Sequence, residues 1–91
     1  MFTSYRVRLT APARRALTAT LPEAIASAAY VFITGPLAAA PHRVGKELHA
    51  PYEGIHSARL GTYRVLYRID DGDRVVVVLA IGARSSIYRS R

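Results

Sequence analysis

The side chains best suited to chemistry in this sequence are arginines that recur at short intervals in its second half. Thirteen Lys and Arg residues oppose six Asp and Glu, which gives a formal net charge of +7, and Lys46 is the sole lysine. Arginine presents a flat fork of donors that fits a phosphate group, and it stays charged at every relevant pH. A small basic domain is therefore expected to bind nucleic acid or an acidic protein. The alternative is that the arginines are ordinary surface charges with no specific partner.

Four of these arginines lie on or beside predicted strands. Arg59 ends one strand and Arg84 follows the last one, whereas Arg64 and Arg68 lie two pleats apart on one face of the strand between them. Cations at corresponding positions of an antiparallel sheet converge on one face, and such a face fits a phosphate backbone. The alternative is solvated arginines paired with acidic residues: Glu47, Glu53 or the turn at 70–73.

Other kinds of site are excluded or find little support. The chain has no cysteine, so disulfides, thiolate metal sites and cysteine nucleophiles are excluded. The glutamates form no paired-carboxylate arrangement, and the aspartates at 70–73 fit turn chemistry better than metal binding. His42 and His49 are expected in loops or on the surface. We therefore predict neither a metal nor a cofactor.

A sheet is needed to position the arginines, and the sequence predicts one α+β domain over residues 1–91. The expected order is β-α-α-β-β-β, with a helical hairpin packed on one face of a small, mainly antiparallel four-stranded sheet. A chain of 91 residues is too short for two cores. No window fits a transmembrane span and the N-terminus has no signal-peptide pattern, so a cytoplasmic location is expected.

The first half predicts a strand and then the hairpin. Residues 5–9 alternate apolar and charged, and Thr10 can cap a short helix that has Pro12 in its first turn. A capping box at 20–23 begins a second helix that runs to about Thr34, where Gly35 and Pro36 are expected to stop it.

The second half predicts strands at 55–60, 63–69 and 74–81 after an irregular segment at 36–54, with a tight Asp-Gly hairpin at 70–73. Tyr63, Val65, Tyr67 and Ile69 should face the helices, which leaves Arg64, Leu66 and Arg68 on the open face. The last strand is apolar on both faces, so it should be central. The uncovered apolar strip beside Val76, Val78 and Ala80 should be closed by a partner or by the C-terminal segment.

The element order and the segments at 41–48, 53–69 and 81–89 resemble the RelE branch of the RelE/ParE toxin superfamily. The most specific parts are the run Gly-Thr-Tyr-Arg-Val-Leu-Tyr at 61–67 and the tail Arg-x-x-Ile-Tyr-Arg at 84–89. The resemblance implies a toxin of a type II toxin–antitoxin system that cleaves messenger RNA in the A site of the 70S ribosome without metal. It also implies neutralisation by a RelB-like antitoxin, operator-DNA binding through that antitoxin, and no membrane partner.

The resemblance also implies roles for individual residues. Arg64 and Arg84 would stabilise the transition-state phosphate with Arg59 close by, and Tyr88 would stack on a base or transfer a proton. Further RNA contacts are expected from Lys46, His56, Arg68 and Arg89. A helix of the antitoxin is expected to dock at Val76, Val78 and Ala80.

Two departures from the family pattern keep other functions open. Ala83 stands where many relatives carry a histidine, and the strand at 55–59 carries His56 and Arg59 in place of paired lysines. Activity could therefore be weak, or the proton could pass through His56 or His49. The alternatives are a ParE-type inhibitor of DNA gyrase and a non-catalytic basic module that binds RNA or protein.

Overall fold

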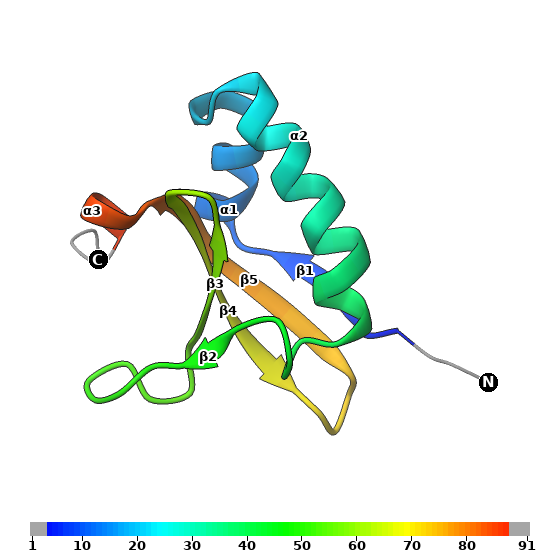
Figure 1. Ribbon diagram of the computed structural model, residues 1–91. Coiled ribbons are helices and arrows are strands. Elements are labelled where there is room, and N and C mark those ends of the chain that lie inside the picture. Colours follow the sequence, from blue (N-terminus) through cyan, green and yellow to red (C-terminus); the bar gives the residue numbers. More distant parts are fainter. Residues whose placement is uncertain (1–3, 88–91) are drawn as a thin grey trace.

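A computed structural model describes residues 4–87 of the chain, with side chains through residue 85. Its sheet has five strands in the order β1-β5-β4-β3-β2, with β1 parallel to β5 and all other pairs antiparallel. The strands are β1 (Arg6–Leu9), β2 (Lys46–Glu47), β3 (His56–Leu60), β4 (Tyr63–Asp70) and β5 (Val75–Ala83). The helical segments are α1 (Ala11–Arg15), η1 (Ala16–Thr20), α2 (Glu23–Phe32), η2 (Ile33–Leu37) and α3 (Arg84–Ile87). The hairpin that α1 and α2 form lies over one face of the sheet (Figure 1), which confirms the predicted α+β class.

The fifth strand, β2, lies in the segment that was expected to be irregular. Lys46 pairs with Ser57 and Glu47 with His56, so β2 extends the sheet beyond β3. A strand of two residues has no periodicity that sequence analysis can detect, because alternation needs at least four residues. The predicted four-stranded sheet was therefore one strand too small.

The start of the helical hairpin follows the predicted capping. The Thr10 hydroxyl accepts a hydrogen bond of 3.3 Å from the Ala13 backbone N–H, and Pro12 lies in the first turn. The predicted capping box does not form, because Thr20 lies in the π-helical turn η1 and Pro22 precedes α2 without a side-chain cap. No helix among residues 4–87 has the length and apolar character needed to cross a membrane.

The second helix does not end at Gly35 and Pro36. It continues through the π-helical turn η2, which contains Pro36 and buries Ile33 and Leu37. Pro36 has no backbone N–H to donate in either the α-helical or the π-helical pattern, so the helix continues past it with one hydrogen bond fewer. The predicted stop was wrong because burial of Ile33 and Leu37 outweighs the helix-breaking tendency of proline.

The core lies between the hairpin and the sheet. Val65 and Tyr67 of β4 are fully buried there, and Ile69 packs against the same cluster. The helices contribute Ala13, Ala16, Ile33 and Leu37. Since β4 alternates, Arg64, Leu66 and Arg68 point to the opposite face, as predicted. We call this opposite side of the sheet the open face.

The β4–β5 hairpin differs from the predicted Asp-Gly turn. The positive φ falls on Arg74, at 54°, and not on Gly72. The Asp70 carboxylate accepts a hydrogen bond of 3.0 Å from the Asp73 N–H, and the Arg74 guanidinium lies 4.3 Å from the centre of the Tyr5 ring. Side-chain contacts thus hold a non-glycine residue in the left-handed region.

Candidate functional site

Arg59 and Arg64 face each other directly across β3 and β4. Ala58 and Val65, which follow the opposite alternation, are buried in the core, so both arginines lie on the open face. Directly opposed residues of an antiparallel pair have Cβ atoms about 5 Å apart. Arg64 pairs on its other side with Gly82 of β5, which has no side chain to cover it. The sheet therefore places two arginine side chains next to each other on the open face.

Arg84 joins this pair at the same end of the sheet. Its backbone N–H donates a hydrogen bond of 3.1 Å to the carbonyl of Thr62, in the turn between β3 and β4. A shallow hollow of about 470 Å³ lies here, lined by Thr62, Ala83, Arg84 and Ser85. Strands β3 and β4 and the start of α3, directly after β5, thus bring one arginine each to one corner of the sheet, which we call the arginine corner (Arg59, Arg64 and Arg84).

Carboxylates do not neutralise the arginine corner. The Arg64 guanidinium donates a hydrogen bond of 3.2 Å to its neighbour's carbonyl, at Tyr63. Glu47 accepts the Gly54 N–H instead, at 3.0 Å. Among residues 4–85, no ion pair joins Arg59, Arg64, Arg68 or Arg84 to a carboxylate. The alternative of Arg64 and Arg68 paired with Glu47, Glu53 or the acidic turn is therefore not observed, and the corner presents concentrated positive charge to an anion.

Lys46 and Arg68 also lie on the open face. Lys46 pairs with Ser57, which pairs with Leu66, so its side chain points the same way as those of Leu66 and Arg64. Arg68 is exposed and its guanidinium lies against Gly54, where an added Cβ would be 3.0 Å from Nη1. Both cations thus share the open face with the arginine corner and could contact the same polyanion.

His56 does not belong with the arginines. It pairs with Tyr67 on the helix side of the sheet, and the two rings stack with centroids 5.4 Å apart. Its Nδ1 atom is buried with no hydrogen-bond partner, and burial lowers the pKa of the imidazole. Alternation in β3 turns His56 away from Arg59, so the RNA contact predicted for His56 is not part of the arginine corner and stays a prediction. His49 is exposed in the loop that precedes β3, at the far end of that strand from Arg59.

The predicted antitoxin-binding strip is divided between the two faces of β5. Val76 and Val78 are fully buried in the core and face the helices. A register shift between Leu66 and Tyr67 pairs Ala80 with Leu66, so Ala80 lies on the open face. A β-bulge adds one residue and inverts the alternation beyond it. Val76 and Val78 were therefore wrongly assigned, whereas Ala80 keeps the predicted orientation.

The open face leaves little apolar surface uncovered. Leu66 is 8% exposed and Val75 is 7% exposed, although neither faces the hairpin. The short helix α3 contacts both β4 and β5. Tyr88 and Arg89, for which roles were predicted, lie outside the described residues.

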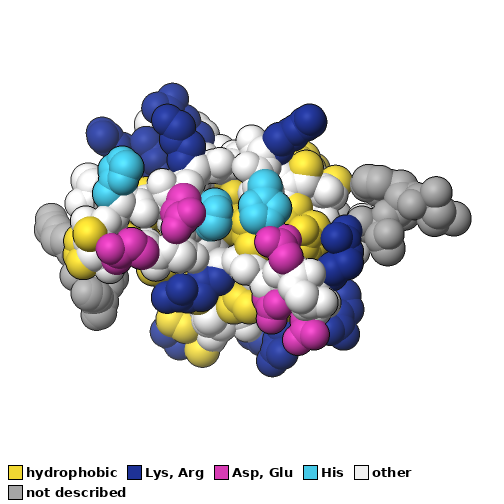
Figure 2. Space-filling model, turned by 90° about the horizontal axis from the view of Figure 1, so that it is seen from below, with side chains coloured by type: hydrophobic (Ala, Val, Ile, Leu, Met, Phe, Trp, Pro, Cys, Tyr) yellow, Lys and Arg dark blue, Asp and Glu magenta, His cyan; other side chains and the backbone are white. Residues whose placement is uncertain are grey.

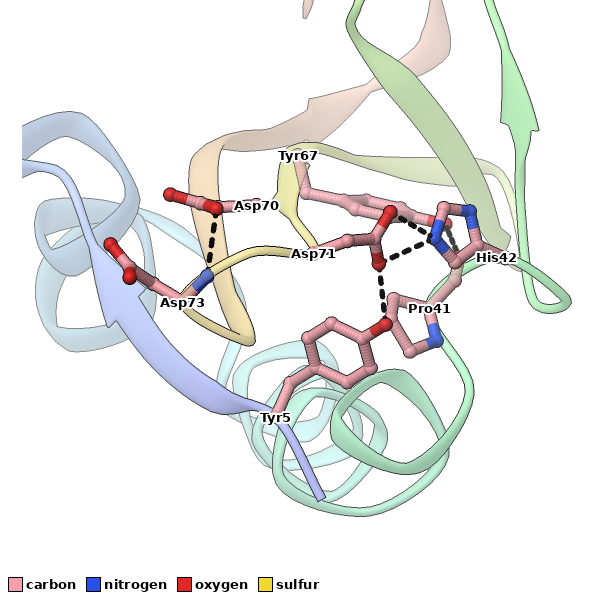
Figure 3. A network of polar contacts seen from close by, with 7 residues as sticks. All are labelled: Tyr5, Pro41, His42, Tyr67, Asp70, Asp71 and Asp73. Atoms are coloured by element: carbon pink, nitrogen blue, oxygen red, sulfur yellow. Dashed lines mark hydrogen bonds and ion pairs between the residues drawn. The ribbon is translucent and has the colours of Figure 1, made fainter. Parts of the chain in front are cut away.

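A polar network at the opposite end of the sheet was not predicted. The Asp71 carboxylate accepts hydrogen bonds from the Tyr5 hydroxyl at 2.6 Å and from His42 Nε2 at 2.9 Å (Figure 3). The hydrogen bond from Tyr5, and after it the one from His42, lowers the pKa of Asp71. The Tyr5–Asp71 hydrogen bond also raises the pKa of Tyr5. No sequence signal could have revealed the network, since Tyr5 and Asp71 are 66 residues apart.

Histidine and acidic side chains gather on the face of the molecule that this network occupies (Figure 2). The His42 and Asp71 side chains are 57% and 61% exposed, so their ion pair is well solvated. Within residues 4–85, no group of three His, Cys, Asp or Glu has the geometry of a metal site. The network fastens the β4–β5 turn to the start of the chain and to the loop before β2.

Comparison with known proteins gives concordant results. A family model described as the ParE toxin of the type II toxin–antitoxin system, parDE, matches residues 5–88. Toxin RelE of Mycobacterium tuberculosis is 52% identical over 85 residues, covering 93% of this chain and 87% of that protein. Toxin RelG of the same organism is 49% identical over 85 residues, covering 93% and 97%.

A solved structure agrees with these sequence matches. The crystal structure of the RelBE2 toxin–antitoxin complex of M. tuberculosis contains a chain that superposes with a TM-score of 0.83 at 48% identity. The match covers 89% of this chain and 99% of that one.

Proposed function

Because the chain belongs to the RelE branch of the RelE/ParE superfamily of type II toxins, we propose that it is a ribosome-dependent endoribonuclease. It cleaves messenger RNA in the ribosomal A site and so stops translation. The observation that supports this proposal best is the arginine corner, in which Arg59 and Arg64 are direct cross-strand partners and form no ion pair with a carboxylate of residues 4–85.

The reaction is attack of an RNA 2′-OH on the adjacent phosphorus. A bond forms from the 2′ oxygen to phosphorus and the bond from phosphorus to the 5′ oxygen breaks, which leaves a 2′,3′-cyclic phosphate and a 5′-OH. One proton leaves the 2′-OH and one is delivered to the 5′ oxygen. The pentacoordinate transition state gathers negative charge on the phosphoryl oxygens, and fixed cations lower its energy. The guanidinium groups of the chain can supply that charge without a metal ion.

Roles for individual residues follow from this chemistry. Arg64 and Arg84 hold the phosphoryl oxygens, and Arg59 adds positive charge beside them. Tyr88 is the proposed proton-transfer or base-stacking group, because His56 stacks on Tyr67 on the other face of the sheet. The absence of a histidine at Ala83 leaves the chain with one fewer acid–base group than many relatives, which suits a slow enzyme.

A RelB-like antitoxin is the proposed partner that keeps the enzyme inactive. The structure that matches this chain at 48% identity is that of a toxin–antitoxin complex. A segment that covers the arginine corner would exclude RNA, and Ala80 lies on the same open face. We further propose that the complex binds operator DNA through the antitoxin and that the toxin acts in the cytoplasm.

An in vitro cleavage assay with and without 70S ribosomes tests the enzymatic proposal. Wild-type protein should cut messenger RNA only in the presence of ribosomes. Arg64→Ala and Arg84→Ala should each lower the rate about 100-fold or more, since each removes a transition-state donor. Arg15→Ala removes an exposed arginine of α1, in the helical layer that covers the other face of the sheet, and should have no effect. Equal rates in all four proteins would contradict the proposal.

Inhibition of DNA gyrase is the second candidate, because the matching family model is that of the ParE toxin. Induction of such a toxin would produce DNA breaks and leave messenger RNA uncut. Primer extension on messenger RNA, run beside an assay for DNA breaks, separates the two activities. A basic module with neither activity would produce neither signal.

A further inference from the structure

The edge strand β1 carries two arginines that the proposed mechanism does not use. Val7 and Leu9 pack against the core, so the alternating Arg6 and Arg8 point to the open face, where both are exposed. Arg8 pairs with Val77 of β5, and Val77 pairs with Arg68 of β4. A row of side chains thus crosses three strands with an arginine on each side of a valine.

The neighbouring row has a different charge. Arg6 pairs with Val75, and Val75 pairs with Asp70. That row therefore contains one cation and one carboxylate, whereas the Arg8 row contains two cations. Neither Arg8 nor Arg68 forms an ion pair with a carboxylate among the residues described through 85. Two like charges on one exposed row favour an anionic ligand.

We propose that Arg8 and Arg68 form a second contact for the RNA backbone, separate from the arginine corner. The inference depends on the proposed function, since it extends the same RNA across the sheet. Measured between backbone positions, Arg64 and Arg68 are four residues or about 13 Å apart along β4, and Arg8 lies two strands or about 10 Å from Arg68. The Arg68 guanidinium lies against Gly54, before β3. The second contact therefore engages nucleotides that flank the cleaved bond.

RNA suits this row better than an acidic protein segment does. The row lies on the same face as the arginine corner, so one strand of RNA can cross both without bending around an edge of the sheet. No aromatic side chain belongs to the row, so it offers charge and donors but no stacking surface for bases. Its contacts should therefore be to phosphate groups and independent of base sequence.

Binding of fully 2′-O-methylated RNA tests the inference, because the methyl group blocks the attacking 2′-OH and prevents cleavage. A trinucleotide can occupy the arginine corner alone, whereas a longer single strand reaches both contacts. Wild-type protein should bind the longer RNA more tightly. Arg8→Ala should weaken that binding several-fold and lower the slope of log affinity against log salt by about 0.7, the value for one lost phosphate contact on a single strand. It should leave trinucleotide binding unchanged.

Arg6→Ala is the matched control, because it removes another exposed arginine from the same face of the same strand. It should have the smaller effect on the longer RNA, since its row already contains Asp70. Thermal melting confirms that both variants are folded.

Three results would overturn the inference: equal losses in Arg6→Ala and Arg8→Ala, equal binding of both RNAs by wild-type protein, or weaker binding of a glutamate-rich peptide by Arg8→Ala with RNA binding unchanged. If Arg64→Ala still abolishes cleavage in any of these cases, the proposed function stands without the second contact. Wild-type protein that cleaves nothing on ribosomes would instead refute the proposed function.

Discussion

The hydroxyl of Tyr67 donates a hydrogen bond of 2.7 Å to the carbonyl oxygen of Pro41, which joins the middle of β4 to the loop before β2. The tyrosine is fully buried, and burial raises its pKa to about 12. Gly45, at the end of the same loop, lies directly against the hydroxyl. Lys46 follows Gly45 and projects to the open face. The buried phenol therefore fixes the loop that positions a cation of the proposed RNA surface.

Tyr67→Phe should lower the free energy of unfolding by about 1–3 kcal/mol, because the Pro41 carbonyl then loses its partner in a buried site. Urea denaturation measures the change. Tyr63→Phe is the control, since no hydrogen bond of the Tyr63 hydroxyl is found among the described residues. Its free energy of unfolding should stay within about 0.5 kcal/mol of wild type. A similar loss in both variants would mean that the Tyr67–Pro41 bond has no special importance.

Gly45→Ala should destabilise the protein by about 1–3 kcal/mol, because the new Cβ would collide with the Tyr67 hydroxyl and lie 2.8 Å from the Ser57 carbonyl oxygen. Gly35→Ala is the matched control, since its Cβ would meet nothing within 4 Å inside a helix. Gly35→Ala should leave the free energy of unfolding unchanged or raise it by up to about 1 kcal/mol. Thermal melting compares the two; a Gly45→Ala protein as stable as wild type would contradict the predicted collision.

His56→Phe should leave RNA cleavage unchanged while it makes the protein less sensitive to acid. The phenyl ring keeps the stack on Tyr67 and removes the unpartnered Nδ1. Burial lowers the folded-state pKa of His56 below 6.5, so its contribution to stability is present above that value and is lost as the pH falls through the folded-state pKa. Urea denaturation at pH values above and below 6.5, together with the ribosome assay, checks both parts. A large loss of cleavage would place His56 in the active site after all.

Asp71→Asn should remove part of the acid dependence of stability. Hydrogen bonds from Tyr5 and His42 lower the folded-state pKa of Asp71 below 3.8, so this contribution is present above 3.8 and is lost as the pH falls through the folded-state value. The pKa of Tyr5 is raised above 10.0, so its contribution is present below 10.0 and is lost as the pH rises through the folded-state value.

Unfolding titrations of wild type, Asp71→Asn and the control Glu53→Gln test the role of Asp71. Glu53 is an exposed carboxylate that lies outside the network. The difference in free energy of unfolding between wild type and Asp71→Asn should shrink as the pH falls. The difference between wild type and Glu53→Gln should stay the same. Parallel curves for all three proteins would show that the network does not couple Asp71 to folding.

Periodicity was sufficient to predict much of the fold. The alternation in β4 separates Val65 and Tyr67 from Arg64 and Arg68, and the structure places the two sets on opposite faces as expected. The double-sided apolar pattern of β5 predicted a central strand, and β5 does lie between β1 and β4. The Thr10 cap is equally local, because its hydrogen bond spans three residues.

The errors arose where distant contacts decide the outcome. A bulge in β5, opposite Leu66 and Tyr67 of β4, places Val78 and Ala80 on opposite faces of the sheet. The two-residue strand β2 is defined only by its pairing with β3, where Lys46 pairs with Ser57. Burial of Ile33 and Leu37 carries the second helix past Pro36.

The sequence by itself determined which residue types were available and which face of each regular strand they occupy, because both depend on composition and on a period of two. Only the tertiary structure decided that Arg59 meets Arg64, that Arg84 joins them at Thr62, and that Arg8 shares a row with Arg68. Strand order and register set these relationships, and they result from packing between residues far apart in the chain.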